Sequence, residues 1–253
     1  MAQENPVPVY GEKALKLGET LVLSDLHIGM EQELGAKGVS IPSQTKNMER
    51  RILSLIKRTG AEELVLLGDV KHNIPSLSIQ EYREIPLFLK RLSEEAAVTV
   101  VKGNHDGNLE KIAPETPVLD SLEREGALLT HGHGWIKAGR IDADVVVMGH
   151  CHPAVAFVDE FSRTSKEPVW IRAQFNEGIK EHYAVEEPPE LIVMPAFNDL
   201  IGGVAFNRGL EGQPIGPYFK SRMVDLEDAR AYLLDGTDLG TLSDLEAAHK
   251  KTD

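Results

Sequence analysis

The sequence is poor in cysteine, in long apolar runs and in long basic runs; its one thiol is Cys151. A single cysteine excludes an internal disulfide framework and favours a reducing compartment, so we expect a cytoplasmic protein. No apolar run approaches the roughly 18 residues that a membrane-spanning helix needs. Residues 1–8 are polar and lack the apolar segment of a secretory signal. These absences predict no membrane association.

Acidic residues outnumber basic ones, 40 to 27, so the formal net charge is −13. Proteins that bind nucleic acid non-specifically usually show a basic patch or stripe. The densest basic stretch, residues 46–58, has helical spacing and is better interpreted as the solvated face of one helix. The composition, 42% hydrophobic and 26% charged, is that of an ordinary soluble globular protein.

Apolar runs of Leu and β-branched residues predict strands that are buried on both faces. Each run ends in a polar turn; in the first half of the chain they are residues 21–23, 64–67, 98–101, 127–130 and 145–148. Between the first two runs, residues 43–58 carry apolar side chains at helical spacing. This spacing predicts an amphipathic helix with Ser43 as its N-cap and Gly60 as its stop.

Strand patterns dominate after His152, at residues 154–158, 169–175, 191–195 and 229–234, with a hairpin signal at Asp235-Gly236. Two sheets packed face to face, with helices outside, would join both halves in a single domain spanning residues 1–253. We expect residues 1–19 and 244–253 to be peripheral tails. We interpret Gly202-Gly203 as a turn and not a phosphate cradle, because it opens no recognisable helix.

Five polar motifs each follow a predicted strand. They are Asp25-Leu26-His27, Gly68-Asp69-Val70-Lys71-His72, Gly103-Asn104-His105-Asp106, Thr130-His131-Gly132-His133 and Gly149-His150-Cys151-His152. One motif alone is weak evidence, because Gly-Asp is a common turn and a lone histidine is usually a satisfied polar residue. However, all of the 9 histidines except His182 and His249 fall in these motifs. Their joint placement predicts a metal site.

The residue types fit that chemistry. Residues i and i+2 of an extended segment point the same way, so we expect Asp25 and His27 to converge where α/β sheets bind ligands. A carboxylate has two oxygens, so Asp69 can bridge two cations about 3.5–4 Å apart. Paired imidazoles after a strand suit metals better than a core. Asn104 offers a neutral oxygen ligand, and His105 can protonate a leaving oxygen.

The ordered motifs, which span residues 25–152, resemble those of the calcineurin-like metallophosphoesterase superfamily. Residues 191–197 and 232–237 resemble the archaeal branch of predicted phosphoesterases, which is related to the nuclease subunit of the double-strand-break repair complex. The resemblance implies a four-layer α/β/β/α sandwich of two mixed β-sheets flanked by helices. It also implies two metal sites that share Asp69, one with Asp25, His27 and His152, and the other with Asn104, His131 and His150.

The resemblance implies catalytic residues as well. His105 would be the general acid or would stabilise the transition state, and His72 and Asp106 complete the expected catalytic set. Protein Ser/Thr phosphatases carry Asp at the position of His72, whereas the repair nucleases carry His, which favours phosphodiester chemistry. We expect His133 to line the site, and Cys151 to be a small buried residue.

We therefore expect a dinuclear metal-dependent hydrolase that cleaves a phosphodiester or phosphomonoester by metal-activated hydroxide, acting on a nucleotide or another small phosphoester. Manganese is the expected metal, with iron, zinc, nickel and magnesium as alternatives. A nuclease acting on DNA or RNA ends is the alternative function. The acidity, and the lack of room for a DNA-binding cap after His152, favour the small substrate. A scaffold without metals is disfavoured, because every ligand position holds a competent residue. A nucleic-acid partner and a homodimer stay open.

Overall fold

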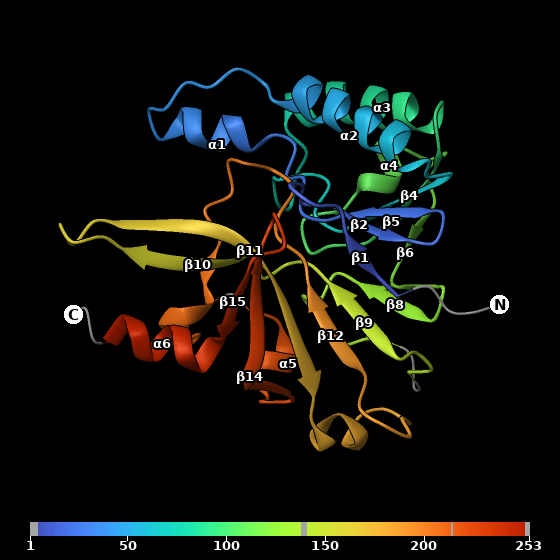
Figure 1. Cartoon of the computed structure of the whole chain (residues 1–253). Coiled ribbons are helices and arrows are strands. Elements are labelled where there is room, and N and C mark those ends of the chain that lie inside the picture. The colour runs from blue at the N-terminus through green and yellow to red at the C-terminus, as the bar shows by residue number, and fades with distance from the viewer. Residues whose placement is uncertain (1–4, 138–140, 214, 251–253) are drawn as a thin grey trace.

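Two β-sheets dominate the computed structural model, which describes residues 5–137, 141–213 and 215–250 (Figure 1). The first sheet has the order β1-β2-β3-β4-β5-β6. Strands β3 to β6 pair in parallel, whereas β1, β2 and β3 pair antiparallel, so the sheet is mixed. Its strands are β1 Val7–Pro8, β2 Leu15–Leu17, β3 Thr20–Leu23, β4 Glu63–Leu67, β5 Ala97–Val101 and β6 Val118–Leu119.

The second sheet has the order β13-β10-β11-β12-β9-β8-β7, with β14 paired to β11 and β15 paired to β14. Strands β8, β9 and β12 pair in parallel, whereas β7 pairs antiparallel to β8, and β10 and β12 antiparallel to β11. Its strands are β7 Leu122–Arg124, β8 Ala127–Thr130, β9 Val145–Met148, β10 Pro153–Val158, β11 Thr164–Phe175, β12 Glu190–Val193, β13 Val204–Ala205, β14 Val224–Leu233 and β15 Asp238–Thr241.

Helices cover the outer face of each sheet. Figure 1 shows α2 and α3 on one side of the molecule and α5 and α6 on the other. The helices are α1 Met30–Ala36, α2 Thr45–Thr59, α3 Ile79–Ser93, α4 Leu109–Ile112, α5 Pro217–Lys220 and α6 Leu242–Lys250, with 3-10 turns η1 Glu177–Glu181 and η2 Phe206–Arg208. The predicted fold class is therefore confirmed: two mixed sheets lie between helical layers. In the described part of the chain, no helix has the length and apolarity to cross a bilayer.

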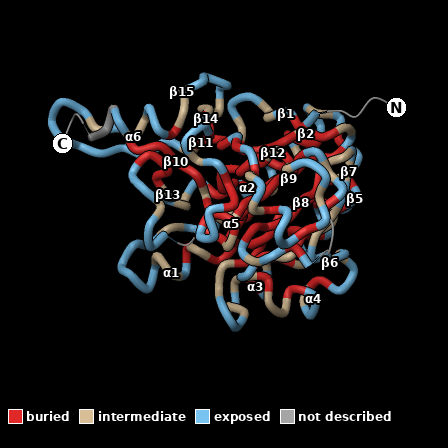
Figure 2. Tube along the Cα trace, turned by 90° about the horizontal axis from the view of Figure 1, so that it is seen from below, coloured by how far each residue is buried: buried red, intermediate tan, exposed pale blue. Residues whose placement is uncertain are grey.

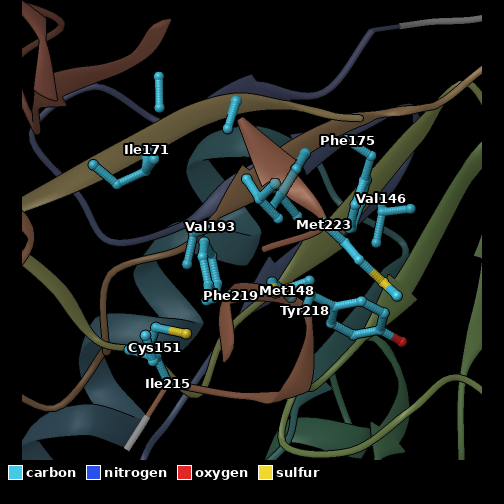
Figure 3. Close-up of a cluster of buried hydrophobic side chains, with 14 of the residues drawn as sticks. Val146, Met148, Cys151, Ile171, Phe175, Val193, Ile215, Tyr218, Phe219 and Met223 are labelled. Atoms are coloured by element: carbon cyan, nitrogen blue, oxygen red, sulfur yellow. The ribbon is translucent and has the colours of Figure 1, made fainter. Parts of the chain in front are cut away.

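Side chains that alternate along the strands create three hydrophobic layers between these four structural layers. In β3, Leu21 and Leu23 pack toward the helices of the first sheet, whereas Val22 packs between the sheets. In β8, Leu129 packs between the sheets and Leu128 packs outward. Figure 2 shows the buried residues running through the centre of the molecule. Figure 3 shows the hydrophobic layer between the second sheet and its helices, where Tyr218 and Phe219 of α5 pack against that sheet. We call it the outermost hydrophobic layer.

The predicted elements differ from the observed ones in a few places. The helix expected at residues 43–58 is α2, but its N-cap is Gln44 and not Ser43; it ends, as expected, at Gly60, which is left-handed with φ 62°. Helix α3 has no counterpart among the predicted elements, although Ser78 and Glu81 form the capping box that marks a helix start.

The expectation of a peripheral N-terminal segment does not hold for residues 15–17. Leu15 and Leu17 are fully buried between the two sheets, and β2 pairs with β3. The Leu-Lys-Leu alternation is too short to stand out as a strand in the sequence. At the other end, α6 lies on the surface and packs Leu242 against the outermost hydrophobic layer.

Candidate metal centre

The five polar motifs converge where the carboxyl ends of β3, β4 and β5 meet those of β8 and β9. Direct contacts join the two sheets at this point. Asp25 Oδ1, after β3, lies 2.9 Å from His131 Nε2, after β8. The backbone N–H of His150, after β9, donates to Asp25 Oδ2 at 3.1 Å. The crevice at the carboxyl ends of parallel strands is where α/β proteins bind ligands.

Three overlapping groups in this region have ligand atoms within 4.8 Å of one another. They are Asp25, His27 and His152; Asp69, His131 and His150; and His27, His72 and His105. The first group contains the residues predicted to hold one cation except the shared Asp69, and the second contains those predicted to hold the other except Asn104. Asp69 Oδ2 lies 3.6 Å from His27 Nε2 and 3.5 Å from His131 Nε2. This carboxylate therefore lies between the two groups, as a shared ligand must.

The donors fit two divalent cations. His27 Nε2 and His152 Nε2 are buried and make no hydrogen bond to the described residues. His152 Nε2 does lie 3.1 Å from Asp25 Oδ1, but the geometry is not that of a hydrogen bond. A buried polar atom without a partner destabilises a fold by about 1–3 kcal/mol. A bound cation would use both nitrogen lone pairs and remove that penalty.

The backbone is left-handed, not extended, at five of the seven predicted ligands. The φ angles are 58° at Asp25, 44° at His27, 51° at Asp69, 65° at His150 and 43° at His152. Each costs about 1–2 kcal/mol for a residue with a Cβ. The prediction that Asp25 and His27 converge because they lie in an extended segment was therefore right about convergence and wrong about its cause. Strain of this kind gathers at functional sites.

Glycines precede three of the predicted ligands, Asp69, Asn104 and His150, and each is needed for close approach. A Cβ atom at Gly68 would lie 2.2 Å from His131 Cδ2, and one at Gly103 would lie 2.1 Å from Asp69 Oδ1. A Cβ at Gly149 would lie 1.8 Å from Ser24 Oγ and 2.6 Å from Asp25 Oδ2. These glycines let three strand ends pack directly against ligand side chains.

Burial and mutual charge set the ionisation of the cluster. Burial opposes ionisation of Asp25, but the neighbouring His152 and His131 outweigh it and hold the pKa of Asp25 well below its usual range. Burial and the nearby Asp25 raise the pKa of Asp69. Burial also acts to lower the pKa of His131, but Asp69 and Asp25 raise that pKa to about 9. For His150, burial and the charge of His131 lower the pKa to about 3, which keeps its imidazole neutral, as a metal ligand requires.

His105 is held by two contacts. Its backbone N–H donates to Asp69 Oδ1 at 2.8 Å, and its Nδ1 makes a hydrogen bond with the backbone carbonyl of His72. A carbonyl only accepts, so Nδ1 carries a hydrogen in this arrangement. The other ring nitrogen, Nε2, is 3.9 Å from Asp69 Oδ2. The side chain is 20% exposed, so a substrate can reach it.

His72 has a partner that the sequence analysis missed. Its Nδ1 lies 3.2 Å from His27 Nδ1, and its Nε2 lies 2.5 Å from Glu33 Oε2 on α1. The Lys37 ammonium and the His72 ring together lower the pKa of Glu33 to about 2. Glu33 follows no strand and belongs to no motif, so the sequence carries no signal for this contact.

Asp106, a member of the expected catalytic set, is held by backbone amides. Its carboxylate is fully buried and accepts backbone N–H groups from Val70 at 2.8 Å, Lys71 at 3.2 Å and Gly103 at 2.8 Å. Burial and the charge of Asp69 raise the pKa of Asp106 to about 6. Asp106 thus ties the loop after β4 to the loop after β5, and its place in the expected catalytic set stays a prediction.

Asn104 and His133 lie on the rim of the cluster. Asn104 is exposed and lines, with His133, a cavity of about 630 Å³. His133 Nδ1 lies 3.1 Å from His131 Nδ1. Burial and the charge of His131 lower the pKa of His133 to about 4. His133 therefore lines the site beside a predicted ligand, in agreement with the expectation.

Cys151 points away from the cluster into the outermost hydrophobic layer, near Ile215 (Figure 3). It is fully buried, and burial raises the pKa of its thiol. The predicted small buried residue is confirmed.

Comparison with known proteins identifies the family to which the chain belongs. Residues 19–170, which include every motif, match the calcineurin-like phosphoesterase superfamily domain. Phosphodiesterase YfcE of Escherichia coli (strain K12) is 34% identical over 115 residues, which are 42% of this chain and 62% of that protein. The chain thus spans less than two thirds of this relative. The crystal structure of nuclease MPE from Pseudomonas putida aligns with 93% of this chain and 100% of its own, with a TM-score of 0.57 and 20% identity, and so shares the fold. The chain belongs to the calcineurin-like phosphoesterase superfamily.

Proposed function

We propose that the protein is a dinuclear metal-dependent phosphodiesterase that acts on a nucleotide-containing substrate. The observation that carries the proposal is the pair of ligand groups on either side of Asp69. Asp25, His27, Asp69 and His152 would hold one cation, and Asp69, Asn104, His131 and His150 the other. Mixed nitrogen and oxygen donors suit manganese, with iron, zinc, nickel or magnesium as alternatives. Bound cations would supply Lewis acidity, which lowers the pKa of water and offsets charge on the phosphoryl oxygens.

His105 supplies the proton for the leaving group. Its Nδ1 is engaged by the His72 carbonyl, so Nε2 is the nitrogen that exchanges a proton with substrate. The hydrogen bond from its backbone N–H to Asp69 fixes the residue beside the cluster. His72 is fixed in turn by Glu33. The chain therefore holds a proton donor at a set position next to the site of cleavage.

Two cavities at the cluster favour a diester over a monoester. One, of about 290 Å³, is lined by His152, and the other, of about 630 Å³, by Asn104 and His133. A diester has two substituents and needs a place for each. Trp135 lines the larger cavity, is 41% exposed and is held by a stack on His182 with ring centroids 4.7 Å apart. An ordered indole of this kind suits a nucleobase.

A nuclease acting on DNA or RNA ends is the second candidate, and Trp135 supports it equally, because every base presents a face for stacking. The net charge of −13 favours a short substrate over long duplex. The relatives are named a phosphodiesterase and a nuclease, which agrees with a phosphodiester as the bond cleaved.

Metal content and substrate preference test the proposal. We expect about two equivalents of metal per chain after loading with manganese, as a dinuclear site requires. The loaded protein should cleave bis-p-nitrophenyl phosphate at higher kcat/KM than p-nitrophenyl phosphate. The proposal fails if the protein binds no more than one equivalent, or if removal and return of manganese leave turnover unchanged.

His105→Ala should keep both metal equivalents and lower kcat by about 10²–10⁴-fold, which is the usual contribution of a positioned acid or base. The loss should be larger on thymidylyl-thymidine than on bis-p-nitrophenyl phosphate, since p-nitrophenolate leaves without protonation and a nucleoside alkoxide does not. Steady-state kinetics on both substrates, with metal analysis of the variant, measure this. An equal loss on both would contradict the role as proton donor, and an unchanged kcat would exclude any catalytic role.

A further inference from the structure

The cavity lined by His152 contains groups that the proposed metal chemistry does not use. Besides His152 its walls include Lys13, Lys166, Asp199 and the pair Gly202-Gly203, and its volume is about 290 Å³. Two lysines and one aspartate line this space in a chain whose net charge is −13. A local excess of positive charge beside the cluster calls for an anionic ligand.

Lys13 is the buried member of the pair. It is 7% exposed, and its Nζ donates to Asp199 Oδ1 at 2.7 Å. An ammonium has three N–H donors, so this contact leaves two. Asp199 is shared, because Arg51 Nη1 donates to its other oxygen at 3.2 Å. Arg51 also donates to Glu12 Oε2 at 2.7 Å, so two carboxylates match Lys13 and Arg51. The excess positive charge of the cavity is therefore that of Lys166.

Lys166 comes from the β10–β11 hairpin, which extends from the second sheet in Figure 1. Its Nζ donates to the carbonyl of Gly203 at 3.1 Å, a neutral acceptor that leaves the charge of the ammonium uncompensated. The side chain is thereby held over the glycine pair while its remaining donors stay available.

The glycine pair is fixed against a predicted metal ligand. Gly203 has φ +61°, and a Cβ there would lie 2.8 Å from the carbonyl oxygen of His152. The same carbonyl accepts the N–H of Val204 at 2.9 Å. Among the described residues, the amide N–H groups of Gly202 and Gly203 donate no hydrogen bond. Successive unused amides next to ammonium groups suit phosphate oxygens.

We propose that this cavity binds a phosphate group of the substrate other than the one that is cleaved. The proposal rests on the proposed function and narrows it to diesters that carry at least one further phosphate, such as a phosphorylated dinucleotide or a short oligonucleotide. It also revises the interpretation of Gly202-Gly203 as a plain turn: the segment opens no helix, yet it lies where its amides and Lys166 can share one anion.

Substrate pairs that differ by one phosphate test the site. Thymidylyl-thymidine is compared with the same dinucleotide carrying a terminal phosphate on its 5′ or its 3′ end. For the native protein, one of the two phosphorylated forms should be cleaved with kcat/KM at least about tenfold higher, which is what one charge-assisted hydrogen bond is worth. In Lys166→Met that ratio should fall below about threefold, mainly through KM. Lys57→Met, which removes the same charge from an exposed position on α2, should keep the full ratio.

A binding measurement separates this proposal from the proposed function. Calorimetry with inorganic phosphate on the metal-stripped full chain should show weak binding that Lys166→Met and Lys13→Met both weaken at least about fivefold, and that Lys57→Met leaves unchanged. The phosphate site is excluded if the native protein shows no phosphate advantage, or if Lys166→Met keeps it. Absence of cleavage of every diester, with phosphate binding still lost in Lys166→Met, would overturn the proposed function and leave the anion site standing.

Discussion

The two sheets contribute different donor atoms to the candidate metal centre. Loops of the first sheet supply the oxygen donors Asp25, Asp69 and Asn104, together with His27, whereas loops of the second sheet supply only imidazoles. Each of the first two ligand groups therefore takes residues from both sheets. The candidate centre can therefore form only when the two sheets are packed in the relative position seen here. Its geometry depends on the hydrophobic layer between them as much as on the ligands.

The first and largest expected effect comes from that layer. Leu129 and Leu128 are neighbours in β8, both buried, but Leu129 packs between the sheets and Leu128 packs outward. Leu129→Ala and Leu128→Ala should each lower the free energy of unfolding by about 2–5 kcal/mol, the range for a buried Leu→Ala change. Only Leu129→Ala should also reduce the increase in unfolding free energy that manganese gives, because only this substitution weakens the packing between the two sheets.

Urea unfolding of both variants, with and without manganese, measures the two effects separately. An equal metal-dependent increment in Leu129→Ala and Leu128→Ala would show that the centre tolerates displacement between the sheets, and would contradict the dependence on their register.

The second prediction concerns the contact between the two sheets at Gly149. Gly149→Ala places a Cβ against Ser24 and Asp25, so Asp25 must move. We expect metal affinity to fall by about 10–100-fold, the usual effect of disturbing the partners that orient a metal ligand. Gly35→Ala is the matched control, because a Cβ there meets nothing within 4 Å. Competition with a chelating dye reports both affinities, and similar values for the two variants would show that Asp25 is not fixed by this contact.

The smallest effect is expected from an ion pair that joins the sheets at their surface. Arg124 Nε of β7 donates to Glu63 Oε2 of β4 at 2.8 Å. The hydrogen bond from Arg124 lowers the pKa of Glu63 below 4.5. The contribution of this ion pair to the free energy of unfolding is therefore present above pH 4.5. It is lost as the pH falls through the lower pKa that Glu63 has in the folded state.

Both partners are more than a third exposed, so Glu63→Gln should cost only about 0.2–1 kcal/mol at pH 7. The difference from the native protein should vanish at a pH below the folded-state pKa of Glu63. Glu62→Gln, at an exposed neighbouring position, is the control. Unfolding curves at several pH values would contradict the assignment if the effect of Glu63→Gln grew as the pH fell.

The sequence predicts the strands that position the centre because consecutive Leu and β-branched residues in each run are followed by a polar turn. Residues 127–130 and 145–148 were predicted with the bounds that β8 and β9 show. The sequence does not predict β2. This strand has only three residues, and its burial depends on a partner sheet that lies more than 100 residues further along the chain.

The backbone of the centre is harder to predict than its composition. The motifs name Asp25, His27, Asp69, His150 and His152, but not their left-handed conformation, because residues with a Cβ seldom adopt it and tertiary packing must impose it. Contacts made outside the motifs are equally hidden. Glu33 reaches His72 from α1, and Asp106 turns from its motif toward backbone amides. Both depend on where loops distant in sequence come to lie.

Cys151 gives the protein an intrinsic reporter of loop opening. It is the one thiol of the chain, it lies between His150 and His152 in sequence, and it is sealed in the core. A thiol reagent can reach it only when the loop that carries both histidines leaves its place. The rate of thiol labelling therefore reports how often the loop that carries His150 and His152 opens, without any engineered probe. A cation bound to those histidines would slow the labelling in proportion to the stability that it adds to the closed loop.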